Sequence, residues 1–399
     1  MSITDDDVPI GDRVAVARKI AGVNQRQLAQ KSHYSVSMVR AVEQGREPAS
    51  PEFVAAVAKA LSIEPQELYG QPYHQLLAQD GGGLPGAAEL QAILAEGNYV
   101  EPLDPTSADE LSADLAAVQS HRHQDQARRA LAKVPVLLRQ LHGLTEASPP
   151  GAEREHAHRL LARAYANAAQ LSYRFGWLVI ASALLDRMET AAVPSGQPLL
   201  AAHAAQQRAL LLMSHSAYES GQRYVQRSLN LIGPPEEEAR LALAGAAHLR
   251  GAVLAARSRN RDRAAEHLRE AERLAALIGH ESPAYDTNMG PGNVAIHRIA
   301  VELDVGDPGR AARDGSRLRL PADVTATRVG RHWQDVARAW VLSGDSSAAL
   351  NALYRARQAA PQQTRYHPHV RETIHAITAK QRRTSGNAAH FAHWLGLKT

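Results

Sequence analysis

The spacing of apolar residues is helical along almost the whole chain. Residues 10–70 hold five short runs in which apolar positions recur every three or four residues, and we expect helices over 12–21, 25–31, 36–44, 51–61 and 65–69. Asn24 and Ser35 precede two of these runs and are residue types that cap helices, whereas Gly45 is typical of a helix end. Between residues 108 and 396, breaks rich in Pro and Gly bracket pairs of helices, and no segment alternates as a strand does. The pattern predicts an all-α fold.

Two other stretches lack this helical pattern. Residues 71–107 carry Gly81-Gly82-Gly83 and four prolines, and acids outnumber bases there, so we expect a linker with one short helix near 87–96. Residues 1–9 are acidic and read as a disordered lead-in. The expected organisation is therefore a lead-in (1–9), a compact domain (10–70), a linker (71–107) and a helical domain (108–396).

Composition narrows the class of protein. The chain of 399 residues contains no Cys, which excludes disulfides and Cys-based zinc sites. Aromatic residues make up only 5%, which disfavours a β-sandwich or barrel. The chain shows neither a signal peptide nor an apolar run long enough to cross a membrane, so we expect a cytoplasmic protein with no membrane partner.

The net charge of +4 indicates no partner by itself, but the charge is concentrated in one segment. Residues 13–46 contain seven Lys and Arg residues and one acidic residue, Glu43, which gives this segment a net charge of +6. In the helix expected at 36–44, Met38, Val39 and Val42 share one side, and the other side carries small or polar residues, namely Val36, Ser37, Arg40, Ala41 and Gln44. Such a face suits insertion into the major groove of DNA, although a solvated helical face would explain the charge as well.

The spacing within residues 24–68 favours DNA binding. The stretch "NQRQLAQKSHYSVSMVRAVEQGREPASPEFVAAVAKALSIEPQEL" resembles the helix-turn-helix of the XRE family, which includes Cro and phage repressors. The matching positions are Gln25, Leu28-Ala29, Ser35, Ser37 and Glu43-Gln44-Gly45. The resemblance implies a five-helix lambda-repressor-like domain that binds a double-stranded DNA operator. Ser32-His33 departs from the Ala-Gly common at this turn, so a looser turn is expected.

Roles follow from position in this motif. Gln25 is expected to bond a phosphate at the N-terminus of its helix, and Arg26 and Arg46 to contact the DNA backbone. Ser37, Arg40 and Gln44 are the candidates for reading bases, Val36 is available to a thymine methyl group, and Ser35 caps the recognition helix. The resemblance also implies that Arg18 and Glu43 form a structural ion pair.

The C-terminal half carries a repeat of about 34 residues. Trp333, Val336, Ala337 and Trp340 stand at the positions of the first helix of a tetratricopeptide (TPR) repeat, and the second-helix positions are filled by Ala349, Leu353, Ala356 and Pro361. The turn Gly344-Asp345 has a counterpart at Gly306-Asp307. A generic Ala-rich bundle is the alternative, but successive helix pairs favour a TPR-like α-solenoid.

The chain as a whole resembles actinomycete XRE regulators with degenerate TPR domains. The recognisable stretches are "GPGNVAIHRIAVELDVGDPGRA" (290–311) and "RARQAAPQQTRYHPHVRETI" (355–374). The resemblance implies a one-component transcriptional regulator that binds a palindromic operator as a homodimer.

The architecture is also similar to the peptide-sensing quorum regulators of Gram-positive bacteria, in which the first helices of the repeats hold an extended peptide. We therefore expect a signalling peptide or small molecule on the concave face. The candidate ligand-binding residues are Asn167, Tyr173, Gln207, Asn293, His297 and Arg331. Asn293 and His297 share a helix face, as two ligand-binding residues would. The alternative is a structural role, in which both residues hold the 281–292 loop in place.

Neither a cofactor nor catalysis is indicated. The pairs His121/His123, His156/His158 and His367/His369 are spaced i,i+2, so their members point apart on a helix, and His390/His393 lack a third acidic ligand. No phosphate loop or nucleophile motif is present, so we predict no catalytic residues and no enzyme. A second hypothesis is a TPR adaptor that uses the helix-turn-helix for recruitment and binds no small ligand.

Overall fold

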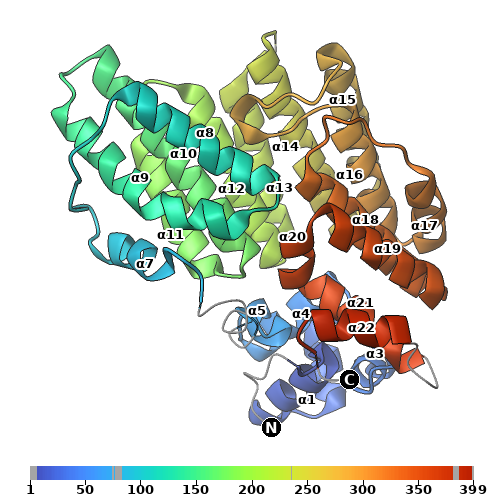
Figure 1. Ribbon diagram of the computed structural model, residues 1–399. Coiled ribbons are helices and arrows are strands. Elements are labelled where there is room, and N and C mark those ends of the chain that lie inside the picture. Colours follow the sequence, from blue (N-terminus) through green and yellow to red (C-terminus); the bar gives the residue numbers. More distant parts are fainter. Residues whose placement is uncertain (1–6, 74–75, 77–82, 235, 381–385, 398–399) are drawn as a thin grey trace.

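The computed structural model describes residues 7–73, 76, 83–234, 236–380 and 386–397, and within these ranges the fold is all-α. The one β feature among them is an isolated bridge between Ser282 and Met289. A small N-terminal domain lies beneath a large curved array of paired helices (Figure 1). No described helix combines the length and apolarity needed to cross a membrane.

The N-terminal domain has the five expected helices. They are α1 (Ile10–Ile20), α2 (Gln25–Ser32), α3 (Val36–Glu43), α4 (Pro51–Leu61) and α5 (Pro65–Tyr69). Side-chain oxygens of Asn24, Ser35 and Ser50 cap α2, α3 and α4 by accepting hydrogen bonds from backbone N–H groups. The apolar faces meet in one core that includes Val14, Leu28, Val39 and Phe53, each 0% exposed.

Close backbone approach sets the geometry of α1 against α3. A methyl group placed on Gly11 would lie 2.1 Å from the carbonyl oxygen of Val42, so only glycine fits at this crossing. The turn between α2 and α3 places His33 in the left-handed region (φ 59°), the conformation that glycine adopts most easily. Ser32 is buried there and donates its hydroxyl hydrogen bond to the Leu28 carbonyl (2.8 Å).

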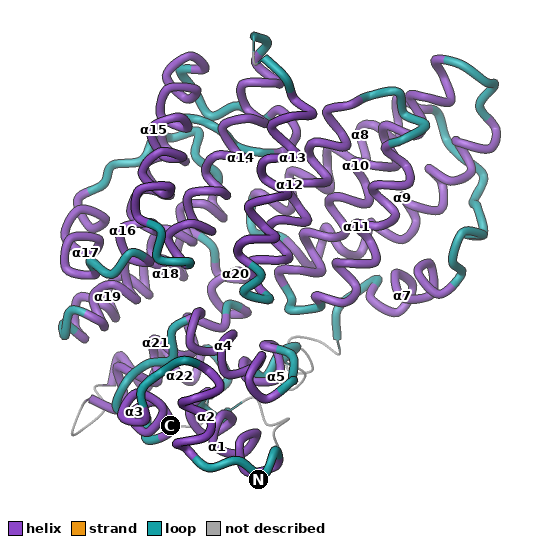
Figure 2. Tube along the Cα trace, turned by 180° about the vertical axis from the view of Figure 1, so that it is seen from behind, coloured by secondary structure: helices purple, strands orange, loops and turns teal. Residues whose placement is uncertain are grey.

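The array contains six antiparallel helix pairs among the described residues. They are α8 (Ala108–His123) with α9 (Ala127–Ala147), α10 (Ala152–Arg174) with α11 (Leu178–Ala192), α12 (Pro198–Ser214) with α13 (Tyr218–Ile232), α14 (Glu238–Arg257) with α15 (Arg261–Ile278), α16 (Pro291–Asp304) with α17 (Pro308–Arg317), and α18 (Ala326–Leu342) with α19 (Ser346–Ala359). Buried alanines such as Ala252, Ala255, Ala264 and Ala271 allow the helices of a pair to cross closely. The first helices of successive pairs contact one another and form the inner layer (Figure 2), as a TPR-like solenoid requires.

The array curls until its two ends meet. Helix α20 (Pro361–Tyr366) returns to the start of the array, where the Asp125 carboxylate accepts hydrogen bonds from the backbone N–H groups of Gln362 (2.6 Å) and Gln363 (2.9 Å). The ring of Tyr366 packs edge-on against Phe175, 5.2 Å between centroids. Helix α18 also contacts α8. The first and last pairs of the array are therefore joined.

The last two helices join the array to the N-terminal domain. Helix α21 (Pro368–Lys380) packs on α18 and α19, together with α22 (Gly386–Trp394), and both lie beside the N-terminal domain (Figure 1). Glu372 of α21 accepts a hydrogen bond from the backbone N–H of Ile10 (3.2 Å), and the ring of His369 lies edge-on to Tyr69 (5.7 Å between centroids). Residues 108–396 were expected to form one helical domain. Within this range, α21 and α22 also pack against the N-terminal domain.

The expected linker at 71–107 is largely folded. Helix α7 (Ala87–Ala95) packs on α9 and α11, where Leu90 and Ile93 are almost fully buried, and the backbone N–H of Leu103 donates to the Arg139 carbonyl (3.1 Å). The short helix expected in the linker is present as α7, and from residue 83 onward the segment packs along the array, with Pro and Gly at its turns. Gly81 and Gly82, like residues 1–6 of the lead-in, lie outside the described residues.

Candidate functional site: a DNA-binding face and an enclosed cavity

The outer face of α3 presents the residues expected to read DNA. Ser37, Arg40 and Gln44 are exposed, and Val36 beside them is half-buried. Arg26 on α2 and Arg46 after α3 are also exposed, as phosphate-contacting side chains must be. Helix α21 borders the loop after α3 at Gly45, Glu47 and Pro48, not the outer face of α3. The face is therefore accessible to a duplex.

A hydrogen-bonded network behind this face orients it. Arg18 forms a bidentate pair with Glu43 (Nε–Oε1 2.6 Å, Nη2–Oε2 2.9 Å), as the resemblance implied. Gln25 donates a hydrogen bond from its side-chain Nε2 to Glu43 Oε2 (2.8 Å), and Arg40 Nε lies 3.5 Å from the side-chain oxygen Oε1 of Gln25. Burial disfavours the Glu43 carboxylate, but the hydrogen bonds from Arg18 and Gln25 outweigh it and lower the pKa of Glu43. Gln25 is thus anchored at the N-terminus of α2 and links the ion pair to the recognition helix.

Ser35 has a structural role. Its hydroxyl accepts a hydrogen bond from the backbone N–H of Met38 (3.1 Å), which caps α3, and it lies 2.9 Å from the Ser37 hydroxyl. Ser37 therefore projects from the first turn of the recognition helix with its hydroxyl already positioned.

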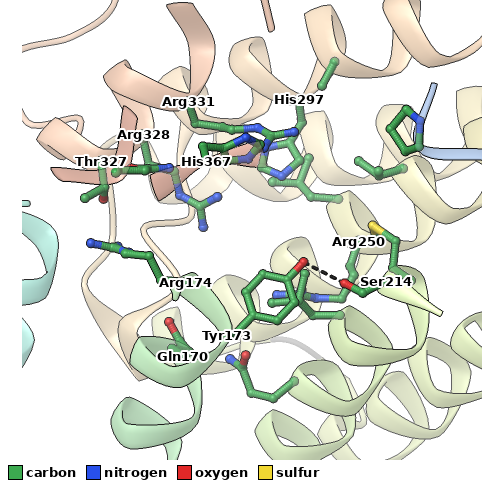
Figure 3. Close-up of a pocket in the computed structure, with 18 of the residues that line it drawn as sticks. Gln170, Tyr173, Arg174, Ser214, Arg250, His297, Thr327, Arg328, Arg331 and His367 are labelled. Carbon is green, nitrogen blue, oxygen red and sulfur yellow. Dashed lines mark hydrogen bonds between the residues drawn. The ribbon is translucent and has the colours of Figure 1, made fainter. Parts of the chain in front are cut away.

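The inner face of the array encloses a cavity of about 380 Å³ (Figure 3). Its walls come from the six first helices, α8, α10, α12, α14, α16 and α18, and from the segment between α20 and α21. The remaining wall belongs to the N-terminal domain, through Pro51 and Ala55 of α4 and Pro65, Gln66 and Tyr69 of α5. The DNA-binding domain is therefore part of the cavity.

Five of the six candidate ligand residues line this cavity: Tyr173, Gln207, Asn293, His297 and Arg331. Asn167 does not, and its assignment as a ligand residue is corrected. Its side chain is 2% exposed and lies between α8 and α10, where Oδ1 accepts from Arg122 Nε (3.1 Å) and Nδ2 donates to the Arg163 carbonyl (2.9 Å). Asn167 positions Arg122 instead.

Asn293 takes part in the loop contact that the sequence suggested and also lies in the cavity lining. Its backbone N–H and that of Gly292 donate to the Glu281 carboxylate, which ties the preceding loop to the start of α16. Its side-chain Oδ1 is buried, faces the cavity wall and has no hydrogen-bond partner among the described residues. His297 Nδ1 bonds the Asn293 carbonyl (2.9 Å), and burial together with nearby Arg328 lowers the pKa of His297 to about 3. His297 is therefore neutral at pH 7.

The cavity is rich in guanidinium groups. Six arginines line it against three aspartates, Asp286, Asp304 and Asp335. Arg257 pairs with Asp304 (3.1 Å), Arg331 pairs with Asp335 (3.0 Å), and Arg122 pairs with Asp286. Arg174 lies 3.8 Å from Asp125 at the edge of the site. Each lining carboxylate is thus already occupied by a guanidinium.

Sequence analysis missed most of these arginines. Arg250 and Arg257 are seven residues apart on α14, in the stretch "GAAHLRGAVLAAR", where His248 is the only other polar side chain. An Arg in a helix that has no polar face was the available signal, because such a residue must be buried or must face a cavity.

A strained loop joins α16 to the opposite side of the cavity. Tyr285 (φ 48°), Asp286 (φ 63°) and Asn288 (φ 48°) adopt the left-handed conformation that non-glycine residues rarely take. Asp286 bonds Arg122 and His123 of α8, and the Asn288 side chain lies 3.2 Å from His123 Nδ1. Burial opposes the charge of Asp286, but Arg122 and His123 outweigh it and lower its pKa. These contacts hold the strained backbone in place.

Comparisons with known proteins support the N-terminal assignment. Residues 9–68 match a family model described as a helix-turn-helix domain. No curated protein matches the chain at a significant level. Among solved structures, the chain is similar to BtubC (BKLC) from P. vanneervenii, with 16% identity over 64% of this chain and 93% of that one and a TM-score of 0.34. It is also similar to Bacillus thuringiensis PlcR in complex with the peptide PapR7 and DNA, with 12% identity over 67% and 95% and a TM-score of 0.28. Both TM-scores are low, and no functional conclusion follows from either likeness.

Proposed function

We propose that the protein is a one-component transcriptional regulator of the XRE type, in which a small molecule or short peptide in the cavity modulates operator binding. The observation that carries the proposal is the shared wall: α4 and α5 of the helix-turn-helix domain close the cavity formed by the repeats. A ligand that contacts this wall differently in two positions of the domain necessarily changes the balance between them.

The DNA-binding half of the proposal rests on the face of α3. Its exposed side chains match the chemistry of major-groove recognition, and Arg26 and Arg46 flank it with positive charge. We propose that two copies bind a palindromic operator as a homodimer, with the two α3 helices in successive major grooves.

The packing of residues 83–107 on the array bears on how a ligand could act. A flexible tether would let the heads move independently of the array, but α7 packs on the array and α21 holds the head from the other side. We therefore propose that a ligand rotates the N-terminal domain as a body against the cavity rim, which alters the spacing of the two heads.

The adaptor hypothesis fits the enclosed cavity less well. A TPR adaptor binds its protein partner along an open concave groove, whereas here α18 meets α8 and the N-terminal domain covers the remaining side. A volume of about 380 Å³ suits a small molecule or a few residues of peptide rather than a folded partner.

Fluorescence anisotropy of the full chain on duplexes that tile its own upstream region tests this function. We expect one duplex to bind at least about a thousandfold more tightly than random DNA at physiological salt, with an affinity that falls steeply as salt rises. Equal affinity for every duplex would contradict a regulator and favour the adaptor.

A further inference from the structure

Two of the cavity's guanidinium groups form no hydrogen bond or ion pair with a described residue. They belong to Arg250 of α14 and Arg328 of α18, which both line the cavity. Arg250 Nε is buried without a hydrogen-bond partner. Each side chain is accessible only where it faces the cavity, between walls of protein (Figure 3).

Neighbouring guanidinium groups further disfavour the charged forms of Arg250 and Arg328. Burial, and then the charge of surrounding guanidinium groups, lowers the pKa of Arg174, Arg250 and Arg328 to about 10 each. Arg122 and Arg328 act on Arg174, and Arg328 acts on Arg250. These arginines repel one another across a common space, into which Arg174 reaches from α10 and Arg328 and Arg331 reach from α18 (Figure 3).

Nearby carboxylates offset this charge in part, because Asp286 and Glu281 favour the charged form of Arg328, but burial and the neighbouring guanidinium groups outweigh them. Burial lowers the pKa of His203 to about 4 and of His297 to about 3, so both rings are neutral at pH 7. Asp286 already binds Arg122 and His123. The cavity therefore holds fixed positive charge, and its carboxylates are engaged by other arginines.

We propose that the cavity is an anion-binding site whose ligand is a small carboxylate- or phosphate-bearing molecule held by Arg250 and Arg328. The guanidinium fork matches the oxygens of either group, and an anion would supply the partner that the two side chains lack. Asn293, whose side chain is unpartnered, lies in the same lining and is available to a polar group elsewhere on the ligand.

This inference deepens the proposed function, because it names the ligand class for the same cavity. It needs no DNA to be tested. The experiment measures ligand-induced stabilisation of the full chain. A negative result would therefore not contradict operator binding, and failure to bind an operator would not contradict the anion site.

The experiment measures the melting temperature of the full chain at pH 7.5 with sodium phosphate, sodium succinate, trialanine or trialanine amide, each against sodium chloride at equal ionic strength. We expect phosphate or a carboxylate probe to raise the Tm by about 3 °C at saturation. A response to phosphate alone identifies a phosphorylated ligand. A response to succinate, or to trialanine but not its amide, identifies a carboxylate. If no probe raises the Tm beyond chloride, the proposal is wrong.

The variant Arg250→Gln/Arg328→Gln locates the effect. It removes two buried charges that repel their neighbours, so we expect a higher Tm than wild type in chloride and no additional gain from any anion. The matched control is Arg227→Gln, on the exposed side of α13, which should respond as wild type does. An unchanged anion response in the double variant would overturn the assignment, and the wild-type measurement decides the question even if that variant fails to fold.

Discussion

Arg257 of α14 lies 3.8 Å from Glu52 in the first turn of α4, so an ion pair joins the wall of the cavity directly to the DNA-binding domain. The same guanidinium contacts Asp304 of α16 at 3.1 Å. Burial disfavours the charged form of Arg257, but Asp304 and Glu52 outweigh it and raise its pKa. The position of α4 is thus coupled electrostatically to two helices of the inner layer.

Asp304 should be among the most sensitive residues for stability. Its carboxylate is 4% exposed and bridges Arg257 and Arg338, each at 3.1 Å. Asp304→Asn would leave the buried guanidinium of Arg338 without a counter-charge and that of Arg257 with Glu52 alone, and we expect a loss of about 3 kcal/mol in the free energy of unfolding. Chemical denaturation measures the loss, with exposed Asp262→Asn as the control. A loss below about 1 kcal/mol would show that the network is not structurally important.

Arg40 and Arg46 should differ in how they affect DNA binding. Arg40 projects from the recognition helix, so Arg40→Ala is expected to cost about 1–3 kcal/mol on the operator and little on random DNA. Arg46→Ala should weaken both equally and reduce the slope of log affinity against log salt by about 1. Anisotropy titrations at several salt concentrations separate these outcomes. Equal losses on both DNAs for Arg40→Ala would place base recognition elsewhere.

Glu372 should make the docking of the N-terminal domain depend on pH. Burial raises its pKa to about 7 from the ordinary value of 4.5, although Ile10 N–H and Arg13 favour its charged form. The folded state therefore binds a proton that the unfolded state releases above pH 4.5, so this stability is present below pH 4.5 and is lost as pH rises through 7.

Glu372→Gln removes this titration while keeping an acceptor for the Ile10 N–H. We expect the variant and wild type to unfold at similar temperatures at pH 5, and the variant to be more stable by about 2 kcal/mol at pH 8. Buried histidines such as His375, whose pKa is lowered to about 4, destabilise both proteins equally as pH falls below 6.5, so the difference between the two isolates Glu372. A difference that is the same at both pH values would rule out this titration.

Asp125 should hold the two ends of the array together. Asp125→Asn retains a residue tolerated at its left-handed backbone (φ 62°) but loses one acceptor and the charge opposite Arg174. We expect amide exchange in residues 361–366 to rise by about tenfold, because their N-terminal N–H groups lose a partner. Hydrogen-exchange mass spectrometry measures this rise, with Asp109→Asn as an exposed control in α8. Unchanged exchange would mean that α20 is held by other contacts.

Local signals in the sequence were sufficient for the N-terminal domain. Proline at the first position of α4 and α5 and the caps at Asn24 and Ser35 mark the helix starts, and the structure places these helices at or within two residues of the predicted bounds. The TPR positions around Trp333 and Trp340 likewise correspond to α18, where Trp340 Nε1 donates to Ser316 Oγ (2.9 Å).

Contacts between distant segments could not be read in this way. Helical periodicity shows that Asn167 lies on a first helix, but not that its side chain turns toward Arg122 rather than the cavity. The contact of Ile10 with Glu372 spans 362 positions and leaves no periodic trace. The charge of the cavity arises from arginines on several helices, and their convergence on one space follows only from the closure of the array.

The affinity of the full chain for its operator, with and without an anion, tests most directly whether the cavity controls DNA binding. It is measured by anisotropy at constant ionic strength, with and without phosphate or succinate. Wild type is compared with Arg250→Gln/Arg328→Gln. We expect an anion to change the dissociation constant of wild type for the operator by at least about fivefold. In the variant, the dissociation constants with and without the anion should agree within about twofold. The same change in both proteins, or no change in either, would contradict the claim that the cavity controls DNA binding.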